Sequence, residues 1–127
     1  LTDLPNGIEA YESAPYHALF PRCAAVVHSG GIGTTAQALR AGVPQMIVPF
    51  AHDQYDNAAR VVRMGAGLQA SNKASASELA ATLSRLDGMN GNAITNWATQ
   101  VGAMIRAENG NSLACDAIDA AIRSASR

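Results

Sequence analysis

Lysine is almost absent from this sequence, in which Lys73 is the only one, and basic residues nowhere cluster. The formal net charge is −1. A nucleic-acid surface needs a concentrated basic field, so we expect no nucleic-acid partner. No apolar run approaches the roughly 18 residues of a membrane span, and no charged-then-apolar leader is visible. We therefore expect a cytoplasmic protein without a transmembrane segment.

Cysteines are also few, since only Cys23 and Cys115 occur, and their spacing does not suit a metal site. We expect both to be reduced, small core residues. Charged residues make up 15% of the chain and apolar residues 48%, which argues against disorder and is enough for a core. A length of 127 residues corresponds to one domain or to part of a larger protein.

Strand and helix patterns alternate along the chain. Apolar runs predict strands at 7–11, 24–28, 45–50 and 67–70; helical spacing predicts helices at 33–42, 55–64, 75–86, 92–110 and 113–125, with a short turn or helix near 17–20. Two capping boxes are expected, Thr34 with Gln37 and Ser75 with Glu78. Strands that are apolar on both faces indicate an α/β fold, a Rossmann-like parallel sheet with helices on both faces.

The densest glycine cluster lies in HSGGIGTTAQ (28–37), directly after the strand AAVV. Ligands of parallel sheets bind beyond the carboxyl ends of the strands. Here a strand ends at His28, glycines form the turn, and a helix begins whose free N–H groups favour an anion, most often a phosphate. The simpler alternative is a tight turn with Thr34 as a helix cap.

Other phosphate and catalytic motifs fit less well. No GK[ST] follows the glycines, and Ser29 does not lie in a nucleophile elbow. Residues 31–36, GIGTTA, match the G-x-G-x-x-A dinucleotide fingerprint, which by itself is a weak signal. A metal site made of His28, His52 and Asp53 can be imagined, but we expect none.

The segment 28–67, with H-x-G-G-x-G-T, G-V-P-Q and P-x-x-x-D-Q-x-x-N, resembles the donor-binding signature of the inverting, two-domain UDP-glycosyltransferases. The nearest likeness is to the bacterial branch that glycosylates macrolides, lipids and hydroxy fatty acids, rhamnosyltransferases included. It extends over nearly the whole chain. The resemblance implies that residues 1–127 are the C-terminal, donor-binding half of a GT-B fold, without its first strands and without the N-terminal acceptor domain.

The same resemblance implies the site residues. It assigns the donor diphosphate to His28, Gly31, Gly33 and Thr34, the transferred sugar to Asp53 and Gln54, and supporting roles to Asn57, Gly30 and Tyr16. It implies a UDP- or dTDP-sugar as substrate, with no metal and no cofactor. An imidazolium at His28 would stabilise the leaving diphosphate. The general base would lie in the N-terminal domain, so this chain should bind donor weakly and not catalyse alone.

The sequence departs from plant members at two places. Residues 12–16 replace their Trp-x-Pro-Gln, and Ala36 replaces their ribose-binding glutamate, so the base and ribose contacts stay unassigned. The alternative for Asp53 is an ordinary helix cap with Asp56 at the matching position. Alternative functions are a sugar-nucleotide epimerase of the same architecture, an NAD-type oxidoreductase half, or a non-catalytic nucleotide-binding module.

One further expectation concerns association. Without its first strands, the sheet has an edge near residues 7–11 or 24–28 that lacks its natural neighbour. An unpaired edge with apolar faces promotes pairing with other chains. We therefore expect self-association of the isolated chain.

Overall fold

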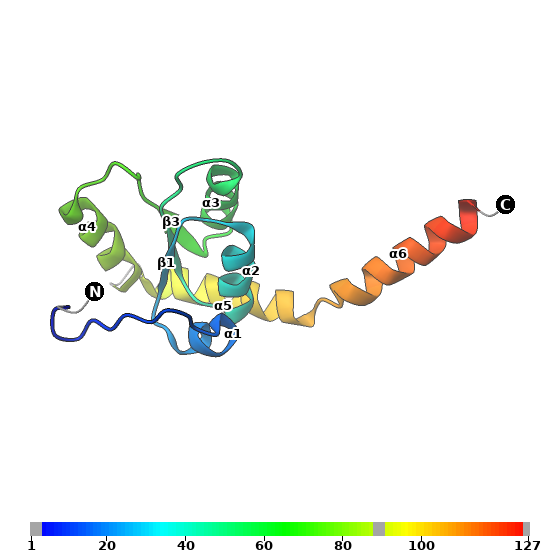
Figure 1. Cartoon of the computed structure of the whole chain (residues 1–127), viewed down its shortest axis with the longest axis horizontal. Coiled ribbons are helices and arrows are strands. Elements are labelled where there is room, and N and C mark those ends of the chain that lie inside the picture. Colours follow the sequence, from blue (N-terminus) through cyan, green and yellow to red (C-terminus); the bar gives the residue numbers. More distant parts are fainter. Residues whose placement is uncertain (1–3, 88–90, 126–127) are drawn as a thin grey trace.

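The computed structural model of the protein describes residues 4–87 and 91–125. Its elements, in chain order, are α1 (Tyr16–Leu19), the 3-10 helix η1 (Phe20–Arg22), β1 (Val26–His28), α2 (Ile32–Ala41), β2 (Gln45–Ile47), α3 (Gln54–Arg63), β3 (Gly67–Gln69), α4 (Ala76–Asp87), α5 (Gly91–Ala107) and α6 (Gly110–Ala125). Strands and helices alternate from β1 to α4, as the sequence pattern predicts (Figure 1).

The sheet is parallel, and its described strands run in the order β1-β2-β3. Val26 pairs with Gln45, and His28 pairs with Ile47. Gln45 in turn pairs with Gly67. The glycine at position 67 is required here, because a Cβ atom would lie 2.4 Å from the Gln45 carbonyl oxygen. The register brings the carboxyl ends of the three strands to the same edge of the sheet.

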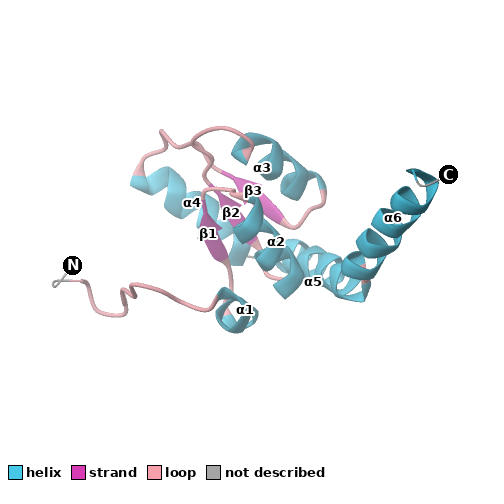
Figure 2. Cartoon of the chain, turned by 45° about the vertical axis from the view of Figure 1, so that its right-hand side comes forward, coloured by secondary structure: helices cyan, strands magenta, loops and turns pink. Residues whose placement is uncertain are grey.

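Helices cover both faces of this sheet, as expected. On one face Ile47 packs with Ala58 and Val61 of α3 and with Ala98 of α5, while Leu39 of α2 lies against the same cluster. On the other face Met46 packs with Ala70 and with Leu86 of α4. Figure 2 shows α4 on the side of the sheet away from α2 and α3. The alternation of Met46 and Ile47 between two buried faces explains why β2 is apolar throughout except at Gln45.

Local signals set several helix ends. Gly42 ends α2 in the left-handed region at φ 76°, which only glycine adopts easily. Ser75 and Glu78 form the expected capping box: the Ser75 N–H donates to Glu78 Oε2 at 2.7 Å, and the Glu78 N–H donates to Ser75 Oγ at 3.3 Å. The Ser75 N–H and the Ser75 hydroxyl both donate to the Glu78 carboxylate, and these two bonds lower the pKa of Glu78.

Two expectations are wrong, one about a strand and one about the cysteines. Residues 7–11 form no strand, because this segment has no neighbouring strand to pair with. Cys115 is exposed and Cys23 is half-buried, so neither is a core residue. Leu83 in α4 is 41% exposed, although Leu86 in the same helix is buried. The apolar face of α6 is exposed rather than packed.

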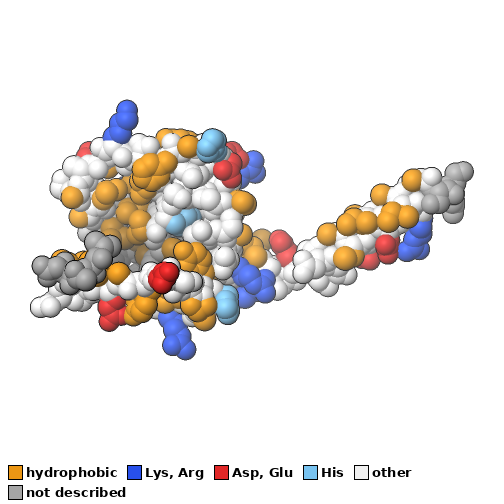
Figure 3. All heavy atoms as spheres, in the orientation of Figure 1, with side chains coloured by type: hydrophobic (Ala, Val, Ile, Leu, Met, Phe, Trp, Pro, Cys, Tyr) orange, Lys and Arg blue, Asp and Glu red, His pale blue; other side chains and the backbone are white. Residues whose placement is uncertain are grey.

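The helix α6 extends away from the rest of the molecule (Figure 1). Apolar side chains follow it over its length (Figure 3), among them Leu113 and Ile118, which are 67% and 59% exposed. In α5, Trp97 is 54% exposed and lies against Gly65, so it belongs to the surface and not to the core.

Within residues 4–87 and 91–125, no helix is both long enough and apolar enough to cross a bilayer.

Candidate functional site

The first half of the candidate site is the turn that follows β1. Gly30 adopts φ 92°, and a Cβ atom at this position would lie 2.8 Å from Ile47 Cγ2 and 3.1 Å from the Gln54 carbonyl oxygen. Both the backbone conformation and the lack of space therefore require glycine. The resemblance implied only a supporting role for Gly30, whereas in the structure the shape of the turn depends on this residue.

The side chain of His28 binds the backbone of this turn. Its Nδ1 atom accepts a hydrogen bond from the Gly30 N–H at 3.0 Å, so its proton is on Nε2, which lies 2.8 Å from Gln45 Oε1. The half-buried ring is desolvated, which lowers the pKa of His28, and the hydrogen bond to Gln45 offsets only part of this effect. Both the geometry and the burial thus favour the neutral ring over the expected imidazolium in this structure.

The helix α2 begins at this turn with open N–H groups. Gly31 is the residue before the first helical turn, and no side chain caps it. The first intrahelical donor is Thr35, whose N–H and Oγ1 both donate to the Gly31 carbonyl oxygen at 3.0 Å. The N–H groups of Ile32, Gly33 and Thr34 precede it and have no carbonyl partner within the helix. Thr34 is thus a first-turn residue, and its expected capping role is wrong.

Open space adjoins these groups. A Cβ atom built on Gly31 or on Gly33 meets no atom within 4 Å. The positive end of the helix dipole lies at the same place. The structure therefore provides a helix N-terminus that can accept an anion, at the carboxyl end of β1.

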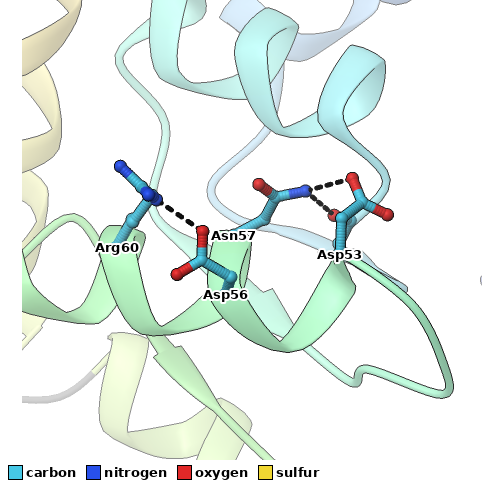
Figure 4. Close-up of polar contacts among 5 residues, drawn as sticks. Asp53, Asp56, Asn57 and Arg60 are labelled. Atoms are coloured by element: carbon cyan, nitrogen blue, oxygen red, sulfur yellow. Dashed lines mark hydrogen bonds and ion pairs between the residues drawn. The ribbon is translucent and has the colours of Figure 1, made fainter.

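The second half of the site is the start of α3. Asn57 is buried, and its Nδ2 atom donates to Asp53 Oδ2 at 2.9 Å and to the Gly30 carbonyl oxygen at 3.0 Å. Asp53 occupies the position before α3, but its side chain does not cap the helix. Asp56 pairs instead with Arg60 at 2.7 Å (Figure 4). The alternative that Asp53 and Asp56 form a helix cap is therefore wrong.

Gln54 closes the loop between β2 and α3. Its Oε1 atom accepts hydrogen bonds from the N–H groups of Phe50 and Ala51, at 2.8 and 3.1 Å. The preceding His52 is exposed and adopts φ 56°, a left-handed conformation that is uncommon for a residue with a Cβ atom. This loop lies beside the glycine turn because Asn57 links the two segments.

Tyr16 lies apart from these residues. Its ring stacks on Phe20, with the ring centres 4.6 Å apart. Figure 1 shows α1 at the end of the sheet opposite the glycine turn. The structure thus brings together His28, Gly30, Gly31, Gly33, Thr34, Asp53, Gln54 and Asn57, and it leaves Tyr16 outside this group.

The part played by Gln45 was not predicted from the sequence. Gln45 is completely buried, and its Nε2 atom has no hydrogen-bond partner among the described residues. Leaving a buried donor unpaired costs about 1–3 kcal/mol. A single glutamine within the apolar run QMIVPF was the available signal.

No three His, Cys, Asp or Glu side chains of residues 4–87 and 91–125 gather closely enough to hold a metal ion.

Comparison with known proteins assigns the chain to a family. Residues 1–115 match the family model described as Erythromycin biosynthesis protein CIII-like, C-terminal domain. The chain is 40% identical over 116 residues to O-mycaminosyltylonolide 6-deoxyallosyltransferase of Streptomyces fradiae, which covers 91% of the chain and 28% of that enzyme. It is 47% identical over 66 residues to a sterol 3-beta-glucosyltransferase of Arabidopsis thaliana, covering 52% of the chain and 11% of that enzyme.

Solved structures agree. The glycotransferase of kitacinnamycin superimposes with a TM-score of 0.81 at 28% identity, over 94% of this chain and 30% of that one. The glycosyltransferase VinC, in complex with dTDP, gives a TM-score of 0.76 at 37% identity, over 84% of this chain and 27% of that one. The chain thus spans less than a third of each of these relatives. It belongs to the family described as Erythromycin biosynthesis protein CIII-like, C-terminal domain.

Proposed function

We propose that residues 1–127 are the donor-binding domain of an inverting, metal-independent glycosyltransferase and bind the diphosphate of a nucleotide sugar at the glycine turn. The observation that carries this proposal is the uncapped N-terminus of α2 beside the open faces of Gly31 and Gly33. Aimed N–H groups and a helix dipole suit a group that gains negative charge as its bond to the sugar breaks.

In this proposal the residues have separate tasks. The N–H groups of Gly33 and Thr34, with the Thr34 hydroxyl, bind the diphosphate oxygens. His28 contributes by fixing the turn through Gly30, and not by a positive charge. Because charge on the diphosphate increases in the transition state, these contacts stabilise the transition state more than the bound substrate.

Asp53 and Gln54 would bind the hydroxyl groups of the transferred sugar. The Asp53 carboxylate is exposed and keeps acceptor capacity beyond its bond from Asn57. The Oε1 atom of Gln54 is occupied by two backbone N–H groups, so its NH2 group is the one left to donate. A carboxylate acceptor beside an amide donor suits hydroxyl groups, which both donate and accept.

The reaction that these contacts would serve is a single displacement. The acceptor oxygen forms a bond to the anomeric carbon while the bond from that carbon to the diphosphate breaks, and configuration inverts. The acceptor proton passes to a general base of an N-terminal domain, and a small molecule or a lipid is the acceptor. We infer a cytoplasmic location, because both cysteines are free, as is usual in a reducing compartment.

Calorimetry with dTDP, UDP, GDP, NAD, thymidine and uridine tests this function. dTDP is the first probe because VinC and the rhamnosyltransferase SpnG have been solved with thymidine diphosphate. We expect dTDP or UDP to bind, each at least several-fold more tightly than its nucleoside. Binding of NAD alone, or equal affinity for nucleoside and nucleoside diphosphate, would contradict the proposal. Donor hydrolysis or transfer should require an N-terminal domain.

A further inference from the structure

Gln45 occupies the first position of the central strand β2, beside Val26, and its side chain reaches His28. It shares a face of the sheet with His28, because Val26 and His28 pair with Gln45 and Ile47 in the parallel register. Its side chain is completely buried, and Oε1 lies 2.8 Å from His28 Nε2. A long polar side chain at a fully buried strand position needs a reason beyond packing.

The hydrogen bonds fix the orientation of both side chains. The Gly30 N–H can only donate, so His28 Nδ1 must be an unprotonated acceptor. The ring proton then lies on Nε2 and needs an acceptor, which is Gln45 Oε1. The opposite amide orientation would put two donors face to face. The Gln45 NH2 group is consequently left without a partner among the described residues.

We propose that Gln45 is a positioning residue for the diphosphate site: it holds His28 as the Nε2–H tautomer, so that Nδ1 binds the Gly30 N–H and keeps the turn open toward the first N–H groups of α2. The effect on diphosphate binding rests on the proposed function. The effect on His28 does not, because it follows from the chain of contacts Gln45–His28–Gly30 alone.

A purely structural role for Gln45 predicts something different. If Gln45 only filled the core, an apolar residue of similar size would serve, since it would remove the unpaired NH2 group. His28 would then keep its tautomer and its contact with Gly30. The two roles therefore differ in what happens at the ring of His28, and not in the change of stability.

Two variants and one control separate them. Gln45→Leu removes the acceptor. Gln45→Glu keeps an acceptor but adds a negative charge, which favours a protonated His28. Because Nε2 already carries a proton, the second proton must go to Nδ1, where it displaces the Gly30 N–H.

Met46→Leu is the matched control, because Met46 is a buried neighbour in β2 on the opposite face. The ring nitrogens of His28 are observed by nitrogen-15 NMR, and dTDP and UDP affinities by calorimetry.

We expect the wild type and Met46→Leu to show the Nε2–H tautomer of His28. In Gln45→Leu the Nδ1–H form should become substantially populated, and affinity for dTDP or UDP should fall about tenfold, the effect of losing roughly one hydrogen bond. In Gln45→Glu the protonation of His28 should move to higher pH. Diphosphate binding should weaken below that pH and recover above it. If Gln45→Leu does not fold, the pH profile of Gln45→Glu still tests the proposal.

Three results would overturn the positioning role: an Nδ1–H tautomer in the wild type, an unchanged His28 ring in Gln45→Leu, or a pH profile of Gln45→Glu identical to that of the wild type. Failure of the proposed function looks different. In that case neither dTDP nor UDP binds the wild type, while the nitrogen-15 signals of His28 still respond to Gln45→Leu, which supports the effect of Gln45 on His28.

Discussion

Asn57 donates a hydrogen bond to the carbonyl oxygen of Gly30 at 3.0 Å, and it thereby ties α3 to a turn that lies 27 residues earlier in the chain. The same Nδ2 atom also donates to Asp53 Oδ2. The two halves of the candidate site, the glycine turn and the start of α3, therefore share one buried amide. Asn57 is 9% exposed, so water cannot readily replace it.

Asn57→Ala should destabilise the protein by about 1–3 kcal/mol, because the Gly30 carbonyl oxygen loses its buried partner. Affinity for dTDP or UDP should fall several-fold as the turn loosens. Urea denaturation and calorimetry measure the two effects. Asp56→Ala in the same helix is the control: its pairing with Arg60 is exposed, so its loss should cost about 0–1 kcal/mol. Equal stability of both variants would contradict the link.

Gly30→Ala should reduce the stability of the fold, whereas Gly33→Ala should reduce binding of the nucleoside diphosphate. Alanine at position 30 meets Ile47 and must adopt φ 92°, so it should destabilise the fold by about 1–3 kcal/mol. Alanine at position 33 meets no atom, so the fold should persist while its methyl group occupies the proposed diphosphate position. Circular dichroism and dTDP titration distinguish them. A Gly33→Ala protein that binds dTDP normally would show that this face does not receive the ligand.

The free energy of unfolding should depend on pH through His28. Burial lowers the pKa of His28 from its ordinary value of 6.5, so the unfolded chain takes up the proton at higher pH than the folded chain. The contribution of the neutral His28 to the free energy of unfolding is therefore complete above about pH 6.5. It is lost as the pH falls from there toward the lowered pKa.

Denaturation from pH 8 to pH 5 measures this loss. The decline should be smaller in His28→Gln and unchanged in His17→Gln, which removes an exposed histidine of α1. A decline of the same size in His28→Gln would assign the pH dependence to other groups.

Self-association should depend on the edge strand β1. This strand pairs with β2 on one side only among the described strands, and its middle residue, Val27, is 51% exposed. An open edge with apolar side chains promotes strand pairing between chains, and a charge there opposes it. Light scattering should show species larger than a monomer at high concentration, and Val27→Lys should reduce them. Ala103→Lys, at an exposed position of α5, should not. A monodisperse wild-type monomer would contradict this prediction.

Local signals in the sequence predicted much of the fold. Helix periodicity located α2 to α5, Gly42 ended α2, and the capping box of Ser75 and Glu78 formed as expected. Each of these features depends on residues within one or two turns of the chain. The strand expected at residues 7–11 did not form, because a strand also needs a neighbour, and no local pattern supplies one.

Local patterns are enough to predict that a glycine turn joins an apolar strand to a helix, because the three glycines and the flanking residues are neighbours in the chain. Which groups of that turn remain free depends instead on contacts between distant segments. Gln45 and Asn57 reach His28 and Gly30 only after β2 and α3 have packed beside β1, and these contacts fix a neutral His28 and an occupied Gly30 N–H. Hydrogen-bond partners across 17 and 27 residues depend on strand register and helix packing, which are properties of the whole core.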